Sequence, residues 1–326
     1  MAGGGEIRRR RARLAQEVAL MLLLTYTNSA SLQFPHPAMA SPPYVRYLPP
    51  HAAPRWLDSG GYLAVKKGAQ LPAPKELCRL CEEVGAEVCF APDVPPPPDA
   101  DEAAYLQTEE GNSSAAEAAP CPLAPVVHVH PSPGAYAAAL RLAVRAAQKL
   151  GAPLLGVGGA VPHLTAHRYA LVRARALEAL QAADRIHLFG AGSPTTLTRL
   201  SLPPGVSVDW AGWTLKASYG KVVLPPEVGG GGERHVTGKK LHKKYPALTS
   251  QEAEALRRWL EERGFAVPPL EEFVEAMRKS YIYRAQVNAF VALKWYKGRK
   301  NASTYAAEKH KKQKFGLPKS SKLQRI

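Results

Sequence analysis

Cysteine is scarce in this chain, with four in 326 residues, the last of them Cys121. So few cysteines argue against a disulfide framework and favour a reducing, cytoplasmic compartment. Long apolar runs are also missing. The apolar residues 18–24 follow a basic stretch at residues 8–13, as in a signal peptide, but they are too few to cross a bilayer. We therefore interpret this region as a basic lead-in to a first strand, and we expect no membrane association.

Acidic residues are in the minority, with 27 Asp and Glu against 43 Lys and Arg, which leaves a net charge of +16. Residues 297–326 alone hold ten basic residues and one acid, Glu308. A concentrated positive charge predicts a polyanionic partner, and we expect that partner to be nucleic acid. The residues expected to bind it are Lys239, Lys240, Lys243, Lys244, Arg284, Lys297, Arg299 and Lys300.

Short apolar runs alternate with helical patterns through the first two thirds of the chain. Strands are expected at residues 21–27, 55–58, 87–93, 126–130, 153–158, 186–190 and 206–209, with helices at 134–150 and 166–183. Such alternation predicts parallel strands with crossover helices, and therefore an α/β fold of the TIM-like (β/α)8 barrel type. Residues 92–125 are poor in helical pattern and predict a long loop on the barrel rim.

The expected organisation has four parts. Residues 1–17 are the basic lead-in and residues 18–226 the catalytic barrel. A glycine run at residues 229–232 interrupts the chain, and helical stretches follow at 250–263 and 270–296. Residues 227–296 are therefore expected to form a helical region, and residues 297–326 a basic tail. Together these two parts make a basic, mainly helical C-terminal extension.

Polar residues close several of the predicted strands, which is where a barrel carries its catalytic groups. Carboxylates at the ends of buried strands are costly to keep ionised, so three of them together indicate a function. The alternative is that each caps a following helix or turn. The residues at these strand ends are Asp58, Asp93, His128, His130, Gly158, Gly159 and Asp209.

Four of these motifs, in their order along the chain, resemble the tRNA-guanine transglycosylases and the related DNA 7-deazaguanine transglycosylases. The motifs are Asp58-Ser59-Gly60-Gly61-Tyr62, the glycines after Leu155, His187-Leu188-Phe189-Gly190-Ala191-Gly192-Ser193-Pro194, and an aspartate one strand later, Asp209. The resemblance covers about residues 21–224. It implies that Asp209 is the nucleophile, Asp58 the general base and Asp93 a base-binding residue. It also implies that Gly158, Gly159 and one of His128 and His130 bind the base, and that Gly190 and Gly192 lie near the ribose and phosphate.

The reaction implied by this resemblance is the exchange of guanine in a nucleic acid for a free 7-deazaguanine base, without a cofactor. The tRNA enzymes carry a cysteine zinc site after the nucleophile, whereas this chain has no cysteine beyond Cys121. DNA is therefore the favoured polymer, and tRNA stays open. The sequence does not determine which 7-deazaguanine is inserted, nor the oligomeric state.

Two other classes of function remain as alternatives. His128 and His130 suit a metal-dependent barrel hydrolase if both are ligands. A basic barrel without catalysis is the second alternative, although such a protein has no use for Asp58 and Asp209 together.

Cys78, Cys81 and Cys89 are interpreted as small packing residues and not as zinc ligands. An apolar stripe at helical spacing is expected either to pack on a core or to stack on bases: Tyr283, Val287, Phe290, Val291 and Trp295.

Overall fold

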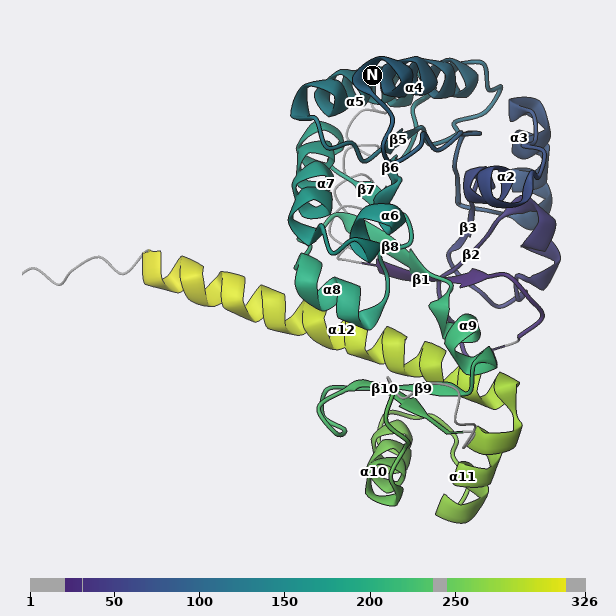
Figure 1. Cartoon of the computed structure of the whole chain (residues 1–326), viewed down its shortest axis with the longest axis vertical. Helices are drawn as coiled ribbons and strands as arrows, with labels where there is room; N and C mark the ends of the chain where they lie inside the picture. Colours follow the sequence, from purple (N-terminus) through teal and green to yellow (C-terminus); the bar gives the residue numbers. More distant parts are fainter. Residues whose placement is uncertain (1–20, 31, 237–244, 315–326) are drawn as a thin grey trace, which may run out of the picture.

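The computed structural model describes residues 21–30, 32–236 and 245–314 (Figure 1). Its main feature is a sheet of eight parallel strands in the order β4-β3-β2-β1-β8-β7-β6-β5. The strands are β1 (Met21–Tyr26), β2 (Ala38–Ala40), β3 (Arg55–Leu57), β4 (Val88–Cys89), β5 (Val126–His128), β6 (Leu155–Gly158), β7 (Ile186–Leu188) and β8 (Val206–Trp210).

The two edge strands of this sheet meet just beyond β4 and before β5. A parallel bridge joins Phe90 to Ala124. Next to it, Ala91 N donates to Ala124 O at 2.8 Å and Ala124 N donates to Cys89 O at 2.7 Å. The sheet therefore curls into a barrel, and the predicted TIM-like architecture is confirmed.

One barrel strand has no counterpart among those expected from the sequence. Strand β2 consists of Ala38–Ala40 only, and it pairs with β1 and β3. Its Ala-Met-Ala sequence has no β-branched or aromatic residue and lies between Pro37 and Pro42, so it carries no recognisable strand signal. Without it the barrel has seven strands.

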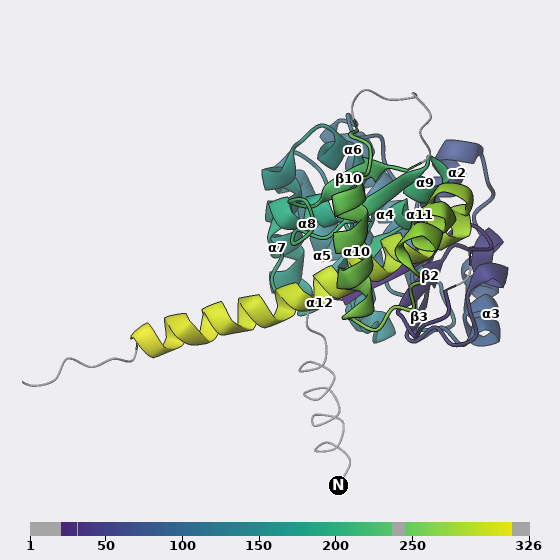
Figure 2. The same cartoon turned by 90° about the horizontal axis from the view of Figure 1, so that it is seen from below.

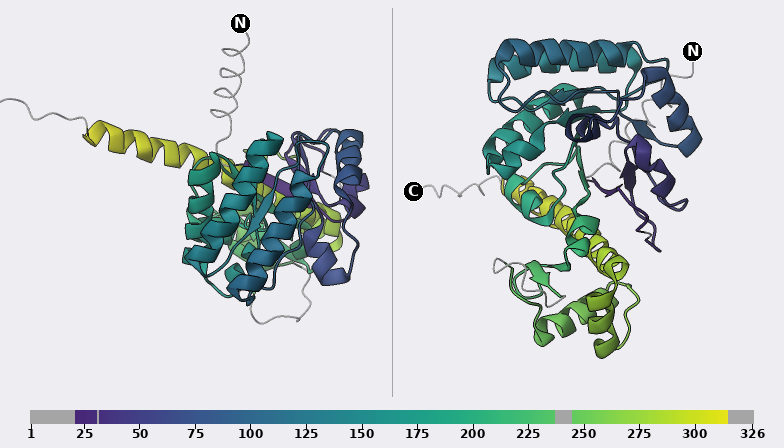
Figure 3. Two further views of the ribbon diagram at one scale, coloured as in Figure 1. Left: turned by 90° about the horizontal axis from the view of Figure 1, so that it is seen from above. Right: turned by 45° about the vertical axis from the view of Figure 1, so that its right-hand side comes forward.

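Helices surround the sheet, as the view from above shows (Figure 3, left). They are α2 (Gly61–Lys67), α3 (Pro74–Val84), α4 (Glu102–Glu117), α5 (Pro133–Leu150), α6 (Ala160–Thr165), α7 (Tyr169–Ala183), α8 (Pro194–Leu200) and α9 (Gly212–Ser218), with a 3-10 helix η1 (Pro42–Tyr47). Alanine-rich α5 and α7 match the helices predicted there. Each presents small side chains to the strands, which lets helix and sheet approach closely.

The prediction of a helix-poor loop at residues 92–125 is wrong, because α4 occupies its centre. Asp101 caps this helix, accepting from Ala104 N at 2.8 Å. The inner face of α4 includes the polar residues Glu109, Asn112 and Ser113, all buried. A helix that buries polar groups lacks the apolar stripe on which sequence reasoning relies.

The interior of the barrel is filled by large side chains from neighbouring strands. Leu23, Met39, Trp56, Phe90 and Val126 form one buried cluster there. Burying each large apolar side chain stabilises the fold by roughly 1.5–3 kcal/mol. The barrel is therefore packed through its centre. His187 is a buried polar side chain among these residues, with its ring against Trp56 and Phe90.

The chain beyond the barrel forms a smaller lobe (Figure 1; Figure 3, right). It contains an antiparallel pair, β9 (Lys221–Leu224) with β10 (Gly232–His235), and the helices α10 (Ser250–Glu261), α11 (Leu270–Lys279) and α12 (Tyr281–Lys314). The expected helix at 270–296 is divided at Ser280, whose backbone is extended. Helix α12 runs beneath the barrel against α9 and β9 (Figure 2).

The apolar stripe of α12 lies on its inner side. Val287, Phe290 and Val291 are buried in the main core, and Tyr283 and Trp295 pack against it. Asn288 fixes the contact with β9, since its Oδ1 accepts from Val223 N at 2.8 Å. The packing interpretation of this stripe is therefore confirmed.

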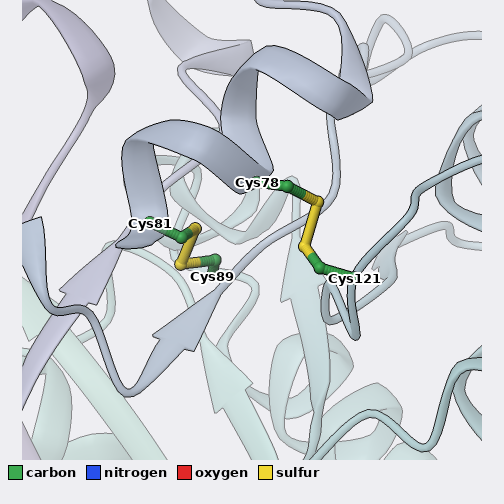
Figure 4. Close-up of a disulfide and its surroundings, with 4 residues drawn as sticks. All are labelled: Cys78, Cys81, Cys89 and Cys121. Carbon is green, nitrogen blue, oxygen red and sulfur yellow. A yellow bond between two sulfur atoms is a disulfide. The ribbon is translucent and has the colours of Figure 1, made fainter. Parts of the chain in front are cut away.

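All four cysteines are disulfide-bonded, Cys78 to Cys121 and Cys81 to Cys89 (Figure 4). The bonds join α3 to β4 and to the segment between α4 and β5. The expectation that the chain has no disulfide framework is wrong, because the fold brings together cysteines that are 43 residues apart in one pair. Cys78, Cys81 and Cys89 do pack in a buried apolar cluster, as expected. Scarce cysteine therefore gives no argument for a reducing compartment. Among the described residues, no helix combines the length and apolar character needed to cross a membrane.

Candidate active site

The three aspartates singled out from the sequence lie at the same end of the barrel. Asp58 follows β3, Asp93 follows the extension of β4, and Asp209 is the penultimate residue of β8. These are the carboxyl ends of parallel strands, and the charges of Asp93 and Asp209 both act on Asp58. The fold therefore gathers the three carboxyl groups into one site.

Asp209 is buried and receives several hydrogen bonds. Thr25 Oγ1 donates to Oδ2 at 2.7 Å, and Gly190 N donates to Oδ1 at 2.5 Å. His187 Nε2 lies 3.4 Å from the same Oδ1, which is long for a hydrogen bond but close enough for electrostatic attraction. Burial by itself raises the pKa of Asp209, but these donors outweigh it and hold the pKa below its ordinary value. Asp209 is therefore an ionised carboxylate at neutral pH.

Glycines of the 187–194 motif hold the backbone of Asp209. Gly192 N donates to Asp209 O at 2.8 Å. A side chain at Gly192 would place its Cβ 2.5 Å from that oxygen, closer than atoms can pack. Gly190 and Gly192 therefore contact the proposed nucleophile directly, and this explains the Gly-x-Gly spacing.

Asp58 has the opposite electrostatic environment. Burial raises its pKa to about 7, and the negative charges of Asp93 and Asp209 add to the effect. A hydrogen bond from Ser41 Oγ to Asp58 Oδ2 at 2.8 Å works against this rise. Asp58 therefore exists as both acid and base near neutral pH, which suits a group that transfers protons.

The residues after Asp58 connect it to Asp93. Ser59 Oγ donates to Asp93 Oδ1, and it also accepts from Gly61 N at 3.1 Å. A Cβ on Gly61 would lie 2.5 Å from Asp93 O, so only glycine fits at this contact. The turn formed by the Asp-Ser-Gly-Gly motif thus carries Asp58 and also contacts Asp93 through Ser59 and Gly61.

The two histidines of β5 have different environments. His128 is buried, and its Nε2 lies 3.0 Å from Asp93 Oδ2. The ring of His130 stacks on Tyr105 at 4.3 Å between centroids, and its Nε2 lies 3.1 Å from Ala100 O. Strand β5 ends at His128, so the two rings do not share a strand face. Only His128 belongs to the carboxylate site, and His130 is a packing residue.

Gly158 and Gly159 lie at the end of β6, against His128. A Cβ at Gly158 would lie 2.6 Å from His128 Cδ2, and one at Gly159 would lie 3.3 Å from His128 Cβ. These glycines therefore leave room for the imidazole ring. That contact is the role that the structure assigns to them.

Sequence reasoning missed three residues of the site: Thr25, Ser41 and Glu109. Thr25 and Ser41 are ordinary hydroxyl residues at or just after the ends of β1 and β2, without a motif. Glu109 lies on α4 and contacts His128 Nδ1 at 2.8 Å through Oε1. A helix prediction for this segment is the only signal that would have brought Glu109 into consideration.

The basic residues expected to contact nucleic acid divide into three groups. Lys239, Lys240, Lys243 and Lys244, and the side chains of Arg299 and Lys300, lie outside the described residues. Lys297 is exposed. Arg284 is 5% exposed, and its guanidinium donates to the carbonyl oxygens of Ala217, Met277 and Arg278. It therefore joins three helices and does not lie on a binding surface.

In the part of the chain that the structure describes, no three or more His, Cys, Asp or Glu side chains form a group suited to a metal ion. In sequence comparisons, no model of a known protein family matches the chain, and no curated protein matches it.

Proposed function

We propose that this protein is a transglycosylase that exchanges guanine in a nucleic acid for a 7-deazaguanine base. The observation that carries the proposal is the contrast between Asp209 and Asp58. The pKa of one is lowered by hydrogen bonds, and the pKa of the other is raised to about 7 by burial and by neighbouring charge. Two carboxyl groups whose pKa values are separated in one site are the usual arrangement for a nucleophile with a proton-transfer partner.

In the first half of the reaction, an ionised Asp209 oxygen attacks C1′ of the target guanosine. The new O–C1′ bond forms as the C1′–N9 bond breaks, and the electron pair leaves with guanine. Protonated Asp58 supplies the proton that the departing base needs. The product of this half is a covalent glycosyl-enzyme together with neutral guanine.

In the second half, N9 of the incoming 7-deazaguanine attacks C1′ and displaces Asp209 as a carboxylate. The N9 proton passes to Asp58, which regenerates the acid that began the cycle. Atoms and electrons balance without an oxidant, a reductant or a nucleotide triphosphate. A pKa of about 7 for Asp58 fits this double role, because both forms are populated near neutral pH.

The base pocket requires an acceptor for the Watson–Crick edge of guanine. N1–H and N2–H of guanine are adjacent donors, and the two oxygens of Asp93 form a matching pair of acceptors. Large apolar side chains are exposed around the same barrel end, with Tyr62 at 60%, Val94 at 47% and Val161 at 44% exposure. They suit contact with the flat face of a base that has left its stack.

The polymer is a nucleic acid because the chain carries a net charge of +16. DNA is favoured over tRNA. All four cysteines are bonded to one another near α3, and none follows Asp209 in the sequence. The chain therefore has no cysteines for the zinc site that the resemblance implies for the tRNA enzymes.

The proposal is tested by incorporation of radiolabelled guanine into duplex DNA and, separately, into tRNA. Wild type is compared with Asp209→Asn and Asp58→Asn, and exposed Asp99→Asn is the matched control. We expect label in DNA with wild type and the control, and at least about a 1000-fold loss in the other two variants. A covalent DNA adduct under denaturing conditions is expected to require Asp209.

Label in tRNA alone would contradict the choice of polymer while it supports the chemistry. Label that enters with Asp209→Asn as fast as with wild type would contradict the covalent mechanism. No exchange into either polymer would refute the transglycosylase proposal and favour a hydrolase or a noncatalytic binding protein.

A further inference from the structure

A buried row of three ionisable side chains, Glu109, His128 and Asp93, forms one wall of the site. Glu109 is 1% exposed, and its Oε1 lies 2.8 Å from His128 Nδ1 and 3.0 Å from His128 N. On the other side of the ring, His128 Nε2 lies 3.0 Å from Asp93 Oδ2. Each ring nitrogen therefore faces a carboxylate oxygen at hydrogen-bonding distance.

This geometry requires both ring nitrogens of His128 to carry a proton. A neutral imidazole has one N–H, so one of its nitrogens would turn a lone pair toward a carboxylate. Burial of the ring favours the neutral form, but the charges and hydrogen bonds of Glu109 and Asp93 outweigh burial and raise the pKa of His128 to about 10. His128 is therefore an imidazolium at neutral pH.

The ring is also fixed in orientation. Gly158 lies against it so closely that a Cβ there would come within 2.8 Å of Nε2. The Tyr105 hydroxyl faces the same residue and donates to His128 O at 2.7 Å, but it carries no charge at neutral pH. Asp93 in turn interacts electrostatically with Asp58. The groups that set the charge of His128 are thus Glu109 and Asp93.

Among the described residues, Glu109 has no hydrogen-bond partner other than His128. Its second oxygen, Oε2, is buried without a hydrogen bond in the described structure. A buried carboxylate with an unsatisfied oxygen is costly, and the cost is offset here only by the contact with His128. Such an arrangement indicates that the positive charge on His128 has a functional role.

We propose that Glu109 is a positioning residue that keeps a proton on His128 Nε2, so that the pocket selects 6-oxo bases such as guanine and 7-deazaguanine and rejects 6-amino bases. This inference rests on the proposed function. It adds a role for Glu109, which the sequence did not indicate, to the base contact expected of His128.

The chemistry follows from the order of donors and acceptors along the base edge. Guanine presents N2–H, N1–H and then the acceptor O6. Asp93 accepts from the two N–H groups. The His128 Nε2–H, which faces Asp93 Oδ2 in the structure, is shared with O6 when the base is bound. Adenine presents an amino group in place of O6, so two donors meet and neither is satisfied. A site built to hydrogen-bond one edge rejects the mismatched edge by about 100-fold or more.

The first test observes His128 directly by 15N NMR across pH 5–10.5 and needs no substrate. Its signal is identified by its loss in His128→Asn. In wild type we expect both ring nitrogens to stay protonated to at least pH 9. In Glu109→Gln, which keeps the shape but not the charge, we expect the midpoint to fall by about two pH units. Glu110→Gln, on the exposed side of α4, is the control and is expected to match wild type.

The second test measures binding of 7-deazaguanine and 7-deazaadenine to the full chain at pH 6 and pH 9. Wild type is expected to prefer 7-deazaguanine at both pH values by about 100-fold. Glu109→Gln is expected to keep this preference at pH 6, where His128 is still protonated, and to lose most of it at pH 9. A purely structural role for Glu109 predicts a loss of affinity that does not depend on pH.

The outcomes separate this inference from the function on which it rests. If wild-type His128 titrates near pH 6.5, or if Glu109→Gln leaves its titration unchanged, the role of Glu109 is refuted whatever the protein binds. If His128 behaves as expected but wild type binds neither base, the proposed function fails, and the selection of 6-oxo bases fails with it.

Discussion

Replacement of Asp58 by asparagine is expected to remove activity and, at the same time, to stabilise the fold above neutral pH. Burial of the Asp58 side chain and the negative charges of Asp93 and Asp209 raise its pKa to about 7 in the folded protein. In the unfolded chain an aspartate titrates near about 3.9. Between these two values the unfolded state releases a proton that the folded state keeps, so stability falls as pH rises.

The size of the effect follows from the two pKa values. A shift of one pKa unit corresponds to about 1.36 kcal/mol, so the rise to about 7 makes ionised Asp58 cost up to about 4 kcal/mol above pH 7. Asp58 is partly exposed to solvent, which makes this an upper limit. Asparagine carries no charge, and its side-chain oxygen still accepts from Ser41.

The assay is urea unfolding of wild type, Asp58→Asn and the control Asp99→Asn from pH 4.5 to 8.5. We expect the free energies of unfolding of wild type and Asp58→Asn to be close at pH 4.5. At pH 8 we expect Asp58→Asn to be more stable than wild type by about 2–4 kcal/mol. A difference that stays constant with pH would refute the assignment of a raised pKa to Asp58. So would a variant that is less stable than wild type at pH 8.

Three further predictions concern other parts of the site and its surroundings. Asp209→Asn is expected to lose stability at neutral pH, and this loss should shrink only as pH falls below the unfolded pKa of about 3.9 toward the lowered pKa of the folded state; urea unfolding from neutral pH down to strongly acid pH checks this. Gly192→Ala is expected to cost about 1–3 kcal/mol and most activity, since its Cβ would lie 2.5 Å from the carbonyl oxygen of Asp209; thermal unfolding and guanine exchange measure both losses. Cys121→Ser is expected to cost about 4 kcal/mol under non-reducing conditions, because it opens a loop of 43 residues, and a reducing agent should remove most of the difference from wild type.

The alternation of short apolar runs with helices was enough to predict the barrel. Strands of this kind are buried on both faces, so their hydrophobic residues are continuous and visible in the sequence. Polar residues that close such strands stand out for the same reason. The rule that parallel strands present their carboxyl ends together then predicted that Asp58, Asp93 and Asp209 share one site.

Other features are invisible in the sequence because they depend on neighbours that only the folded chain brings together. Thr25 contacts Asp209 across 184 residues, and Glu109 reaches His128 from a helix without an apolar stripe. The pairing of the cysteines and the burial of Arg284 are decided in the same way. No local pattern records such contacts, so residue types alone did not reveal them.

The sequence by itself determined the class of fold and which end of the barrel carries the polar chemistry, because both follow from local hydrophobic patterns. Only the tertiary structure decided how the carboxyl groups differ. The pKa of Asp58 rises because its carboxyl group is buried and faces the negative charges of Asp93 and Asp209, whereas that of Asp209 falls because hydrogen-bond donors outweigh its burial. Electrostatic energy depends on distances in space, and those distances exist only once the barrel has formed.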